Sequence, residues 1–79
     1  MNMIDRNKMR VCIKGEGSIS ASRDMLNLIS IAFSEAAYHY EDKGLKHLAK
    51  SYRDTATQIY DRLNETGYYR NKEQNYETD

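Results

Sequence analysis

The chain has 79 residues, of which 30% are charged and 39% hydrophobic, and its twelve basic residues balance its twelve acidic residues. This length predicts one small domain, and the balanced charge argues against a broadly basic nucleic-acid-binding protein or a polyanion mimic. Cys12 is the only cysteine, which excludes an intrachain disulfide and fits a reducing, cytoplasmic setting better than secretion.

The N-terminal residues are charged and are followed by no long apolar segment, so they do not predict a signal peptide. The longest strongly apolar run is shorter than the roughly 20 residues that a membrane-spanning helix requires. We therefore expect a cytoplasmic protein that does not enter a membrane.

An alternation of apolar and polar residues predicts a short β-strand over residues 9–14. Its two faces carry Met9, Val11 and Ile13 on one side and Arg10, Cys12 and Lys14 on the other. The following Gly15-Glu16-Gly17 predicts a turn. Residues 18–20 then form either a return strand, which would complete a hairpin, or the lead-in to a helix.

A first helix is predicted over residues 20–43, and the rest of the chain must be organised around it. Nine of the thirteen residues from 25 to 37 are apolar, and Asn27, Ser30 and Ser34 form one narrow polar stripe. A helix that is apolar on nearly all sides is typically buried. Among the candidate N-caps Ser18, Ser20 and Ser22, we favour Ser20, which lets Ile19 pack on the first turn.

A second helix is predicted over residues 45–66, because its apolar residues recur at spacings of four and three. Gly44 favours the end of the first helix and Gly67 the end of the second. The short connection between them predicts an antiparallel helical hairpin. The predicted fold class is therefore α+β and mainly α: one β-α-α domain over residues 1–67, followed by a polar, tyrosine-containing tail over residues 68–79.

This small domain has too few elements to cover the first helix. The second helix and the strand cover two of its sides, and a third, apolar side stays open. Full burial of one Leu or Ile side chain contributes roughly 1.5–3 kcal/mol, and domains of this size are marginally stable. We therefore predict a homodimer or larger oligomer, in which the N-terminal strand pairs with a strand of another chain. The residues predicted to contribute to self-association are Met25, Leu26, Leu28, Ile29, Ile31 and Phe33. The alternative is a monomer whose hairpin and C-terminal tail wrap the helix.

Basic and tyrosine side chains are the candidate partner-binding residues. Basic side chains bind phosphates or acidic surfaces, and tyrosine suits protein interfaces because its ring packs while its hydroxyl stays hydrated. The candidates are Arg10 and Lys14 on the strand, Lys46, Lys50 and Arg53 beside Lys43 on the second helix, and Tyr38, Tyr60, Tyr68 and Tyr69. The alternative for the basic residues is an ordinary solvent-facing surface.

The sequence offers little support for a metal site or an enzyme. His39 and His47 flank the helical turn with Glu35 and Asp42 nearby, but their spacing matches no known ligand pattern. Cys12 lies within the predicted strand, and so short a chain favours no substrate pocket. We expect no catalytic residue, cofactor, metal or small-molecule substrate.

The leading hypothesis is a small, non-enzymatic, self-associating module that acts as a regulator or inhibitor by binding another macromolecule, with a protein favoured over DNA. Its size suits a protein encoded by a phage or other mobile element. The second hypothesis is a DNA-binding transcriptional regulator. A strand with a basic outer face followed by two helices resembles ribbon-helix-helix proteins in element order, and this resemblance implies DNA contact through Lys8, Arg10 and Lys14. The insert of residues 15–22 and the long first helix depart from that pattern.

Overall fold

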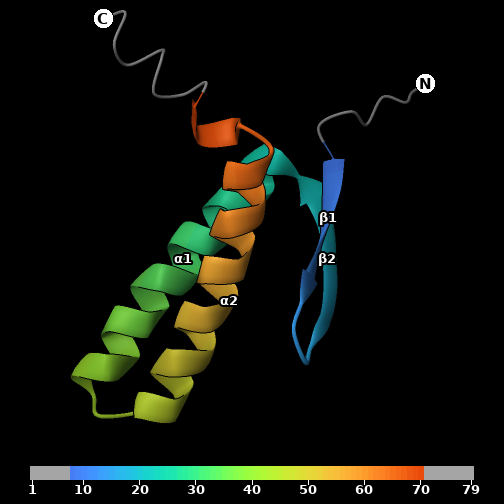
Figure 1. Ribbon diagram of the computed structural model, residues 1–79. Helices are drawn as coiled ribbons and strands as arrows, with labels where there is room; N and C mark the ends of the chain where they lie inside the picture. The colour runs from blue at the N-terminus through green and yellow to red at the C-terminus, as the bar shows by residue number, and fades with distance from the viewer. Residues whose placement is uncertain (1–7, 71–79) are drawn as a thin grey trace, which may run out of the picture.

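The structure is a computed structural model, and it describes residues 8–70. The described elements are β1 (Lys8–Ile13), β2 (Gly17–Ser22), α1 (Arg23–Asp42) and α2 (Lys46–Glu65). The two antiparallel strands form one layer, which lies on one face of the helix pair (Figure 1). The prediction of a small, mainly helical α+β fold is confirmed.

The N-terminal strand is one half of a β-hairpin. β1 and β2 pair in antiparallel register from Lys8 opposite Ser22 to Ile13 opposite Gly17. At the turn the backbone N–H of Glu16 donates to the carbonyl of Ile13 at 2.9 Å, and Gly15 adopts a φ of 81°, which glycine reaches without steric cost. Residues 18–20 are thus a return strand, and β1 finds its pairing partner within its own chain.

The first helix begins later than predicted, because β2 extends further than the sequence indicated. Ser20 lies inside β2, which continues for two residues beyond it, so Ser20 does not adjoin the first turn of the helix. Ser22 is the N-cap instead, and its Oγ accepts a hydrogen bond from the backbone N–H of Met25 at 3.1 Å. Asp24 lies in the first turn, where a negative charge favours the helix dipole.

The two helices form the antiparallel hairpin that the sequence predicted (Figure 1). After α1, Gly44 takes a φ of 82°, and the N–H of Leu45 donates to the carbonyl of Tyr40 at 2.9 Å. Lys43 is the C-cap of α1 and not a residue of α2. It therefore does not continue the basic face of α2 as the sequence spacing suggested.

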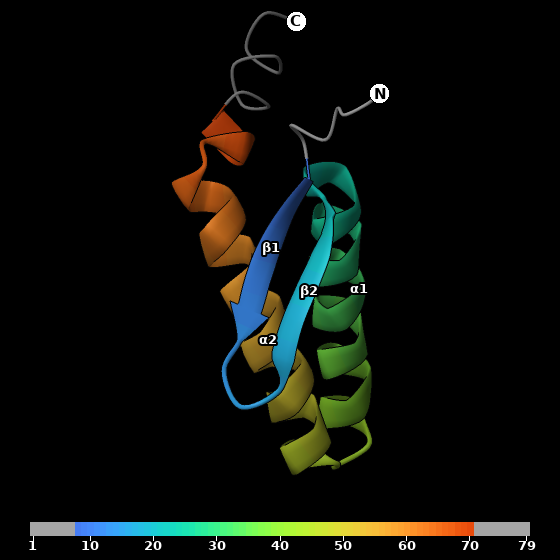
Figure 2. The same ribbon diagram turned by 90° about the vertical axis from the view of Figure 1, so that its right-hand side faces the viewer.

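The core lies between the sheet and the upper half of the helix pair. Its buried residues are Val11, Ile13, Leu26, Ile59, Leu63 and Tyr68. β1 turns Val11 and Ile13 inward, with 0% and 5% of their surface exposed, while Arg10 and Cys12 are exposed. The predicted alternation of the strand is confirmed. Figure 2 shows how the layers align: β1 runs beside α2, and β2 runs beside α1.

One residue of the predicted polar stripe of α1 lies inside the molecule and not on its surface. Ser30 is buried, at 5% exposed, and its Oγ donates to the carbonyl of Asn27 at 3.1 Å. Ala37, Ala49 and Ala56 are buried as well. These small side chains let the two helices approach closely, so the helix pair uses a serine where the sequence favoured larger apolar residues.

The start of the predicted tail belongs to the folded structure. Tyr68 is only 9% exposed and belongs to the core, and Tyr69 packs against it. The rest of the predicted tail, residues 71–79, lies outside the described residues, as do residues 1–7.

Candidate functional site

One side of α1 carries large apolar side chains that nothing in the described chain covers. Met25, Leu28 and Ile31 are 49%, 59% and 50% exposed, and we call these three residues the α1 flank. Because they recur at spacings of three along the helix, they occupy neighbouring positions on its surface. An uncovered apolar flank on the first helix is what the sequence predicted.

The other predicted self-association residues lie elsewhere. Leu26 is fully buried in the core of its own chain. Ile29 packs against that core. Phe33 is half-buried and meets the ring of Tyr52 edge to face at 5.1 Å. These three side chains therefore stabilise the single chain, and the candidate surface narrows to the α1 flank.

Two uncharged stretches of the chain lie next to the α1 flank, separated by Arg23 and Asp24. Residues 17–22, which form β2, contain no charged residue, and neither do residues 25–34 of α1. In a chain that is 30% charged, these stretches stand out. A surface with neither sign of charge does not repel a second copy of itself.

The outer face of the β-hairpin has the opposite character. Lys8, Arg10 and Lys14 are exposed on the β1 side, and Ser18 and Ser20 are exposed on the β2 side. The register sets Lys8 opposite Ser22 and Arg10 opposite Ser20. We call these five exposed residues the ribbon face, and it combines positive charge with hydroxyl groups.

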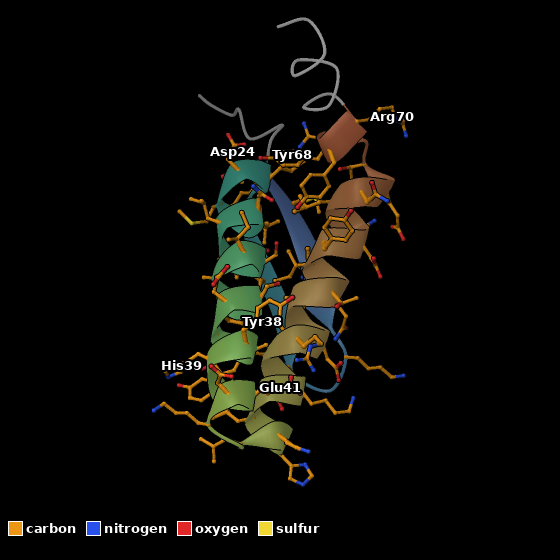
Figure 3. The ribbon with its side chains drawn as sticks, turned by 90° about the vertical axis from the view of Figure 1, so that its left-hand side faces the viewer. Asp24, Tyr38, His39, Glu41, Tyr68 and Arg70 are labelled. Carbon is orange, nitrogen blue, oxygen red and sulfur yellow. The ribbon has the colours of Figure 1, made fainter. Side chains whose placement is uncertain are left out.

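The face of the helix pair that points away from the sheet carries tyrosines (Figure 3). Tyr38 is 71% exposed there. A shallow groove of about 440 Å³ on the helix pair is lined by residues that include Ile31, Tyr60 and Tyr69. The rings of Tyr60 and Tyr69 are 4.8 Å apart. This helical back face, defined by these four residues, brings together three of the four predicted contact tyrosines.

Tyr68 and Tyr69 are engaged within the chain. The hydroxyl of Tyr68 donates to Oδ1 of Asp24 at 2.5 Å, and that of Tyr69 donates to Oδ1 of Asn27 at 2.6 Å. Burial first, and then the hydrogen bond to Asp24, raises the pKa of Tyr68 to about 12. Burial also raises the pKa of Tyr69. Tyr68 is therefore a core residue and not a contact residue.

The basic residues predicted on α2 form local ion pairs. Nζ of Lys50 lies 2.8 Å from Oδ2 of Asp54, and the guanidinium of Arg53 contacts the carboxylate of Glu41 on α1. Lys46 is exposed at the start of α2. Because their acidic partners neutralise Lys50 and Arg53, α2 presents less positive charge than its sequence suggested.

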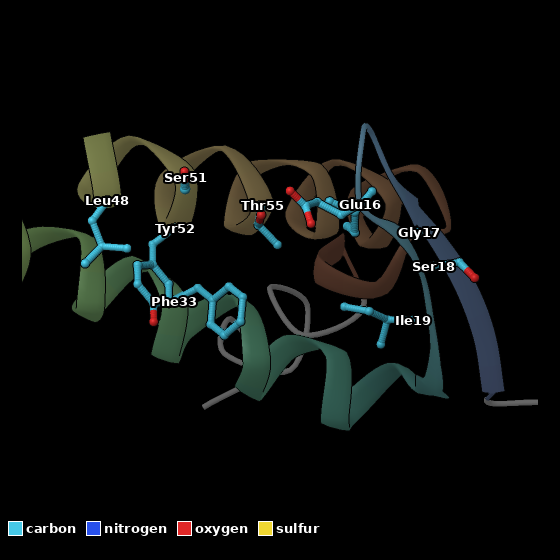
Figure 4. A pocket seen from close by; sticks show the side chains of 10 residues that line it. Glu16, Gly17, Ser18, Ile19, Phe33, Leu48, Ser51, Tyr52 and Thr55 are labelled. Atoms are coloured by element: carbon cyan, nitrogen blue, oxygen red, sulfur yellow. The ribbon is translucent and has the colours of Figure 1, made fainter. Parts of the chain in front are cut away.

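A second groove, of about 340 Å³, opens where the hairpin turn meets the lower half of the helices (Figure 4). Its lining includes the large apolar and aromatic side chains of Ile19, Phe33, Leu48 and Tyr52. Sequence reasoning missed this groove, because it depends on where the tip of the hairpin rests. The backbone N–H of Lys14 donates to Oε1 of Gln58 at 2.8 Å and fixes that position, and neither residue carries a sequence signal for this contact.

The histidines and the cysteine do not assemble a site within residues 8–70. His39 and His47 are both exposed, and His39 meets only the ring of Tyr40 among the ring contacts, at 5.1 Å. No group of three His, Cys, Asp or Glu residues in the described chain is placed to hold a metal ion. Cys12 is exposed on the outer side of β1.

Neither described helix combines the length and the apolar character that crossing a bilayer would require. Comparison of the chain with known proteins found no matching family model, and no significant match to a curated protein or to a solved structure.

Proposed function

We propose that this chain is a small, non-enzymatic interaction module that self-associates and, in the assembled form, binds another protein as a regulator or inhibitor. The observation that carries the proposal is the α1 flank: three large apolar side chains, each about half exposed, sit together on the central helix of the fold. A protein of phage or other mobile-element origin would suit this size and role.

The energetics favour covering the α1 flank. Burying the half of a Leu, Ile or Met side chain that is still exposed contributes about 1 kcal/mol. A two-fold interface centred on Met25 and Leu28 would bury two such side chains from each copy, which is a substantial gain for a domain whose total stability is of order 5 kcal/mol. Self-association of small domains is a common route to that gain.

The helical back face supports binding of a protein partner. Its exposed tyrosines, Tyr38 and Tyr60, are 71% and 48% exposed. The guanidinium of Arg53 contacts the carboxylate of Glu41, which lies toward the lower end of the helix pair (Figure 3). Tyrosine and arginine are enriched among residues that carry binding energy in protein interfaces. Ile31 belongs to both surfaces, whereas Met25 and Leu28 do not line the groove. A partner protein on the helical back face therefore leaves Met25 and Leu28 for the contact with a second copy.

A charge placed in the α1 flank tests the self-association. We expect the wild-type chain to show a mass above 9.2 kDa in light scattering across a concentration series. Leu28→Glu should shift it to the monomer, because the interface would have to bury an unpaired carboxylate. Leu48→Glu is the matched control: it introduces the same charge at another exposed leucine, 42% exposed on α2, and should leave the mass unchanged. A wild-type monomer at every concentration would overturn the proposal.

The ribbon face favours nucleic-acid binding as a second candidate function. A two-stranded antiparallel ribbon fits the major groove of B-DNA, where basic side chains contact phosphates and guanine and hydroxyl groups contact phosphates or bases. Lys8, Arg10 and Lys14 are exposed on this ribbon. The ribbon here is formed by β1 and β2 of one chain, whereas the ribbon-helix-helix resemblance implies strands from two chains.

A further inference from the structure

We propose that two copies of the chain join along the outer edges of their β2 strands, so that the two hairpins form one continuous four-stranded antiparallel sheet with α1 of each copy meeting beneath it. This inference rests on the proposed self-association and specifies its geometry. Two independent features lead to it: the chemistry of the β2 edge and the side of the molecule on which that edge lies.

The two edges of the sheet differ in how well they are protected. The described sheet has two strands, so each strand has one outer edge whose backbone groups face away from its partner. On β1, Lys8 and Arg10 place positive charge beside the outer edge. The C-terminal end of β1 is held against α2, because the backbone N–H of Lys14 donates to the side chain of Gln58. Charged residues and covering helices are the usual protection of an edge strand.

β2 has none of this protection. Its sequence, GSISAS, contains no charge and no proline, and its register with β1 runs without interruption from Gly17 to Ser22. A regular, uncharged edge strand with small side chains readily accepts another strand. Because a charged partner would find nothing complementary on it, the edge is best matched by a strand of the same composition.

The β2 edge and the exposed side of α1 share one side of the molecule. β1 lies beside α2 and β2 lies beside α1, so the free edge of β2 faces the side away from α2 (Figure 2). Met25 and Leu28 are exposed on α1, while Leu26 and Ala37 are buried in its interior side. On a helix with 100° between residues, Leu28 lies nearly opposite Leu26 and Met25 lies about 100° from it, so neither is on that interior side. A copy that pairs with β2 therefore also covers Met25 and Leu28.

The occupant that satisfies both features is a second copy of the chain. A two-fold axis places β2 antiparallel to β2 and brings Met25 and Leu28 close to the same residues of the second copy, which is the self-complementary arrangement that symmetric dimers use. The uncharged stretches at residues 17–22 and 25–34 allow this contact without repulsion between like charges.

The alternation of β2 limits the register of the pairing. Ile19 and Ala21 are half-buried against the core, whereas Ser18 and Ser20 are exposed. Opposed residues of neighbouring strands point to the same face of a sheet. In the joined sheet, all helices must lie on one side, and the two β2 strands must overlap over most of their length. These two conditions place the two-fold axis at Ile19 or at Ser20.

Disulfide cross-linking in a Cys12→Ser background tests this geometry. With the axis at Ser20, Ser20→Cys faces its own copy, and with the axis at Ile19, Ser18→Cys faces Ser20→Cys of the partner. Neighbouring strands are about 4.8 Å apart, within the roughly 7 Å that a disulfide allows between Cα atoms. Arg10→Cys is the matched control, since Arg10 lies opposite Ser20 on the same face of the hairpin. Its two copies would be three strand spacings apart, about 14 Å.

We expect covalent dimer from Ser20→Cys alone or from the Ser18→Cys and Ser20→Cys mixture under mild oxidation, at least tenfold faster than from Arg10→Cys. If light scattering shows a dimer but Arg10→Cys cross-links as fast as the serine variants, the β2 pairing is wrong while the proposed self-association stands. If light scattering shows only monomer, the proposed function fails, and this inference fails with it.

Discussion

Tyr68 links the end of the described chain to the start of α1. Its ring belongs to the core, its hydroxyl donates to Asp24 at 2.5 Å, and the guanidinium of Arg23 lies 6.0 Å from the centre of its ring. Asp24 is in the first turn of α1, where its charge is already favourable. One tyrosine thus combines apolar burial with a hydrogen bond to a carboxylate.

We expect Tyr68→Phe to lower the free energy of unfolding at pH 7 by about 1–2 kcal/mol, because a hydrogen bond to a charged group is lost while the ring stays buried. Urea denaturation followed by circular dichroism measures this change. Tyr38→Phe is the control, since Tyr38 is 71% exposed, and it should have almost no effect.

The raised pKa of Tyr68 gives the same variant a pH signature. The folded-state pKa is about 12 against 10.0 for an ordinary tyrosine, so folding favours the neutral hydroxyl. Its contribution to stability is complete below pH 10 and is lost as pH rises from 10 to about 12. The fall in wild-type stability over this range should therefore be shallower in Tyr68→Phe. Identical slopes in the two proteins would contradict the assigned pKa.

At the scale of the elements, the position of the α1 cap is the sharpest difference between sequence and structure. Ser18, Ser20 and Ser22 are equivalent candidates by residue type, and all three are paired with β1. They differ in where β2 ends, because Ser18 and Ser20 lie inside the strand and only Ser22 is its last residue. Ser22 lies at the junction of β2 and α1 and caps the helix.

Ser22→Ala should therefore lower the free energy of unfolding by about 1 kcal/mol, which is typical for the loss of an N-cap. Ser20→Ala removes the same hydroxyl from an exposed strand position and should change stability by less than about 0.5 kcal/mol. Thermal denaturation of both variants decides between the two caps: a larger loss in Ser20→Ala would place the start of the helix where the sequence alone suggested.

Local sequence patterns predicted the strand and the two helices. The return strand and the burial of Ser30 and Tyr68 depend on tertiary contacts, which those patterns do not reveal. The period of two in β1 and the two glycines after the helices located the strand and the helical hairpin to within a few residues. The return strand was left open because GSISAS carries only one large apolar residue, Ile19. The burial of Ser30 was missed because a serine in a helix usually faces solvent. The burial of Tyr68 was missed because its partner, Asp24, lies 44 residues away.

The sequence predicted the candidate surface residues by their type, and the structure separates those that are exposed from those that are buried in the core. Exposure of Met25, Leu28 and Ile31 follows from the shortage of covering elements, which the sequence makes visible. Sequence alone could not separate them from Leu26, because a helix that is apolar all round has no marked inner side.

At the scale of the whole molecule, equal numbers of basic and acidic residues conceal an uneven distribution. The ribbon face is basic, whereas residues 17–22 of β2 and residues 25–34 of α1 are uncharged. If the ribbon face binds DNA, affinity should fall steeply with salt, with a slope of about −0.9 in the logarithmic plot for each phosphate contacted.

The double variant Arg10→Ala, Lys14→Ala should then make this slope shallower by about two units. Lys46→Ala, Lys50→Ala removes the same charge from α2 and should leave the slope unchanged, as fluorescence anisotropy with a duplex probe would show. Equal losses in both double variants would indicate general charge attraction and not recognition by the ribbon face.

The pairing of neighbours also determines how the chain folds. β1 pairs with β2 and α1 with α2, so most of the structure closes over short loops, and topologies of this kind fold rapidly. The bonds from Tyr68 to Asp24 and from Lys14 to Gln58 each span 44 residues and require both hairpins to be in place. We therefore expect them to form late, after the rate-limiting barrier. Loss of the Tyr68 hydroxyl should therefore accelerate unfolding and leave the refolding rate almost unchanged in stopped-flow experiments. The two long-range hydrogen bonds therefore determine the lifetime of the folded state, because their loss raises the unfolding rate.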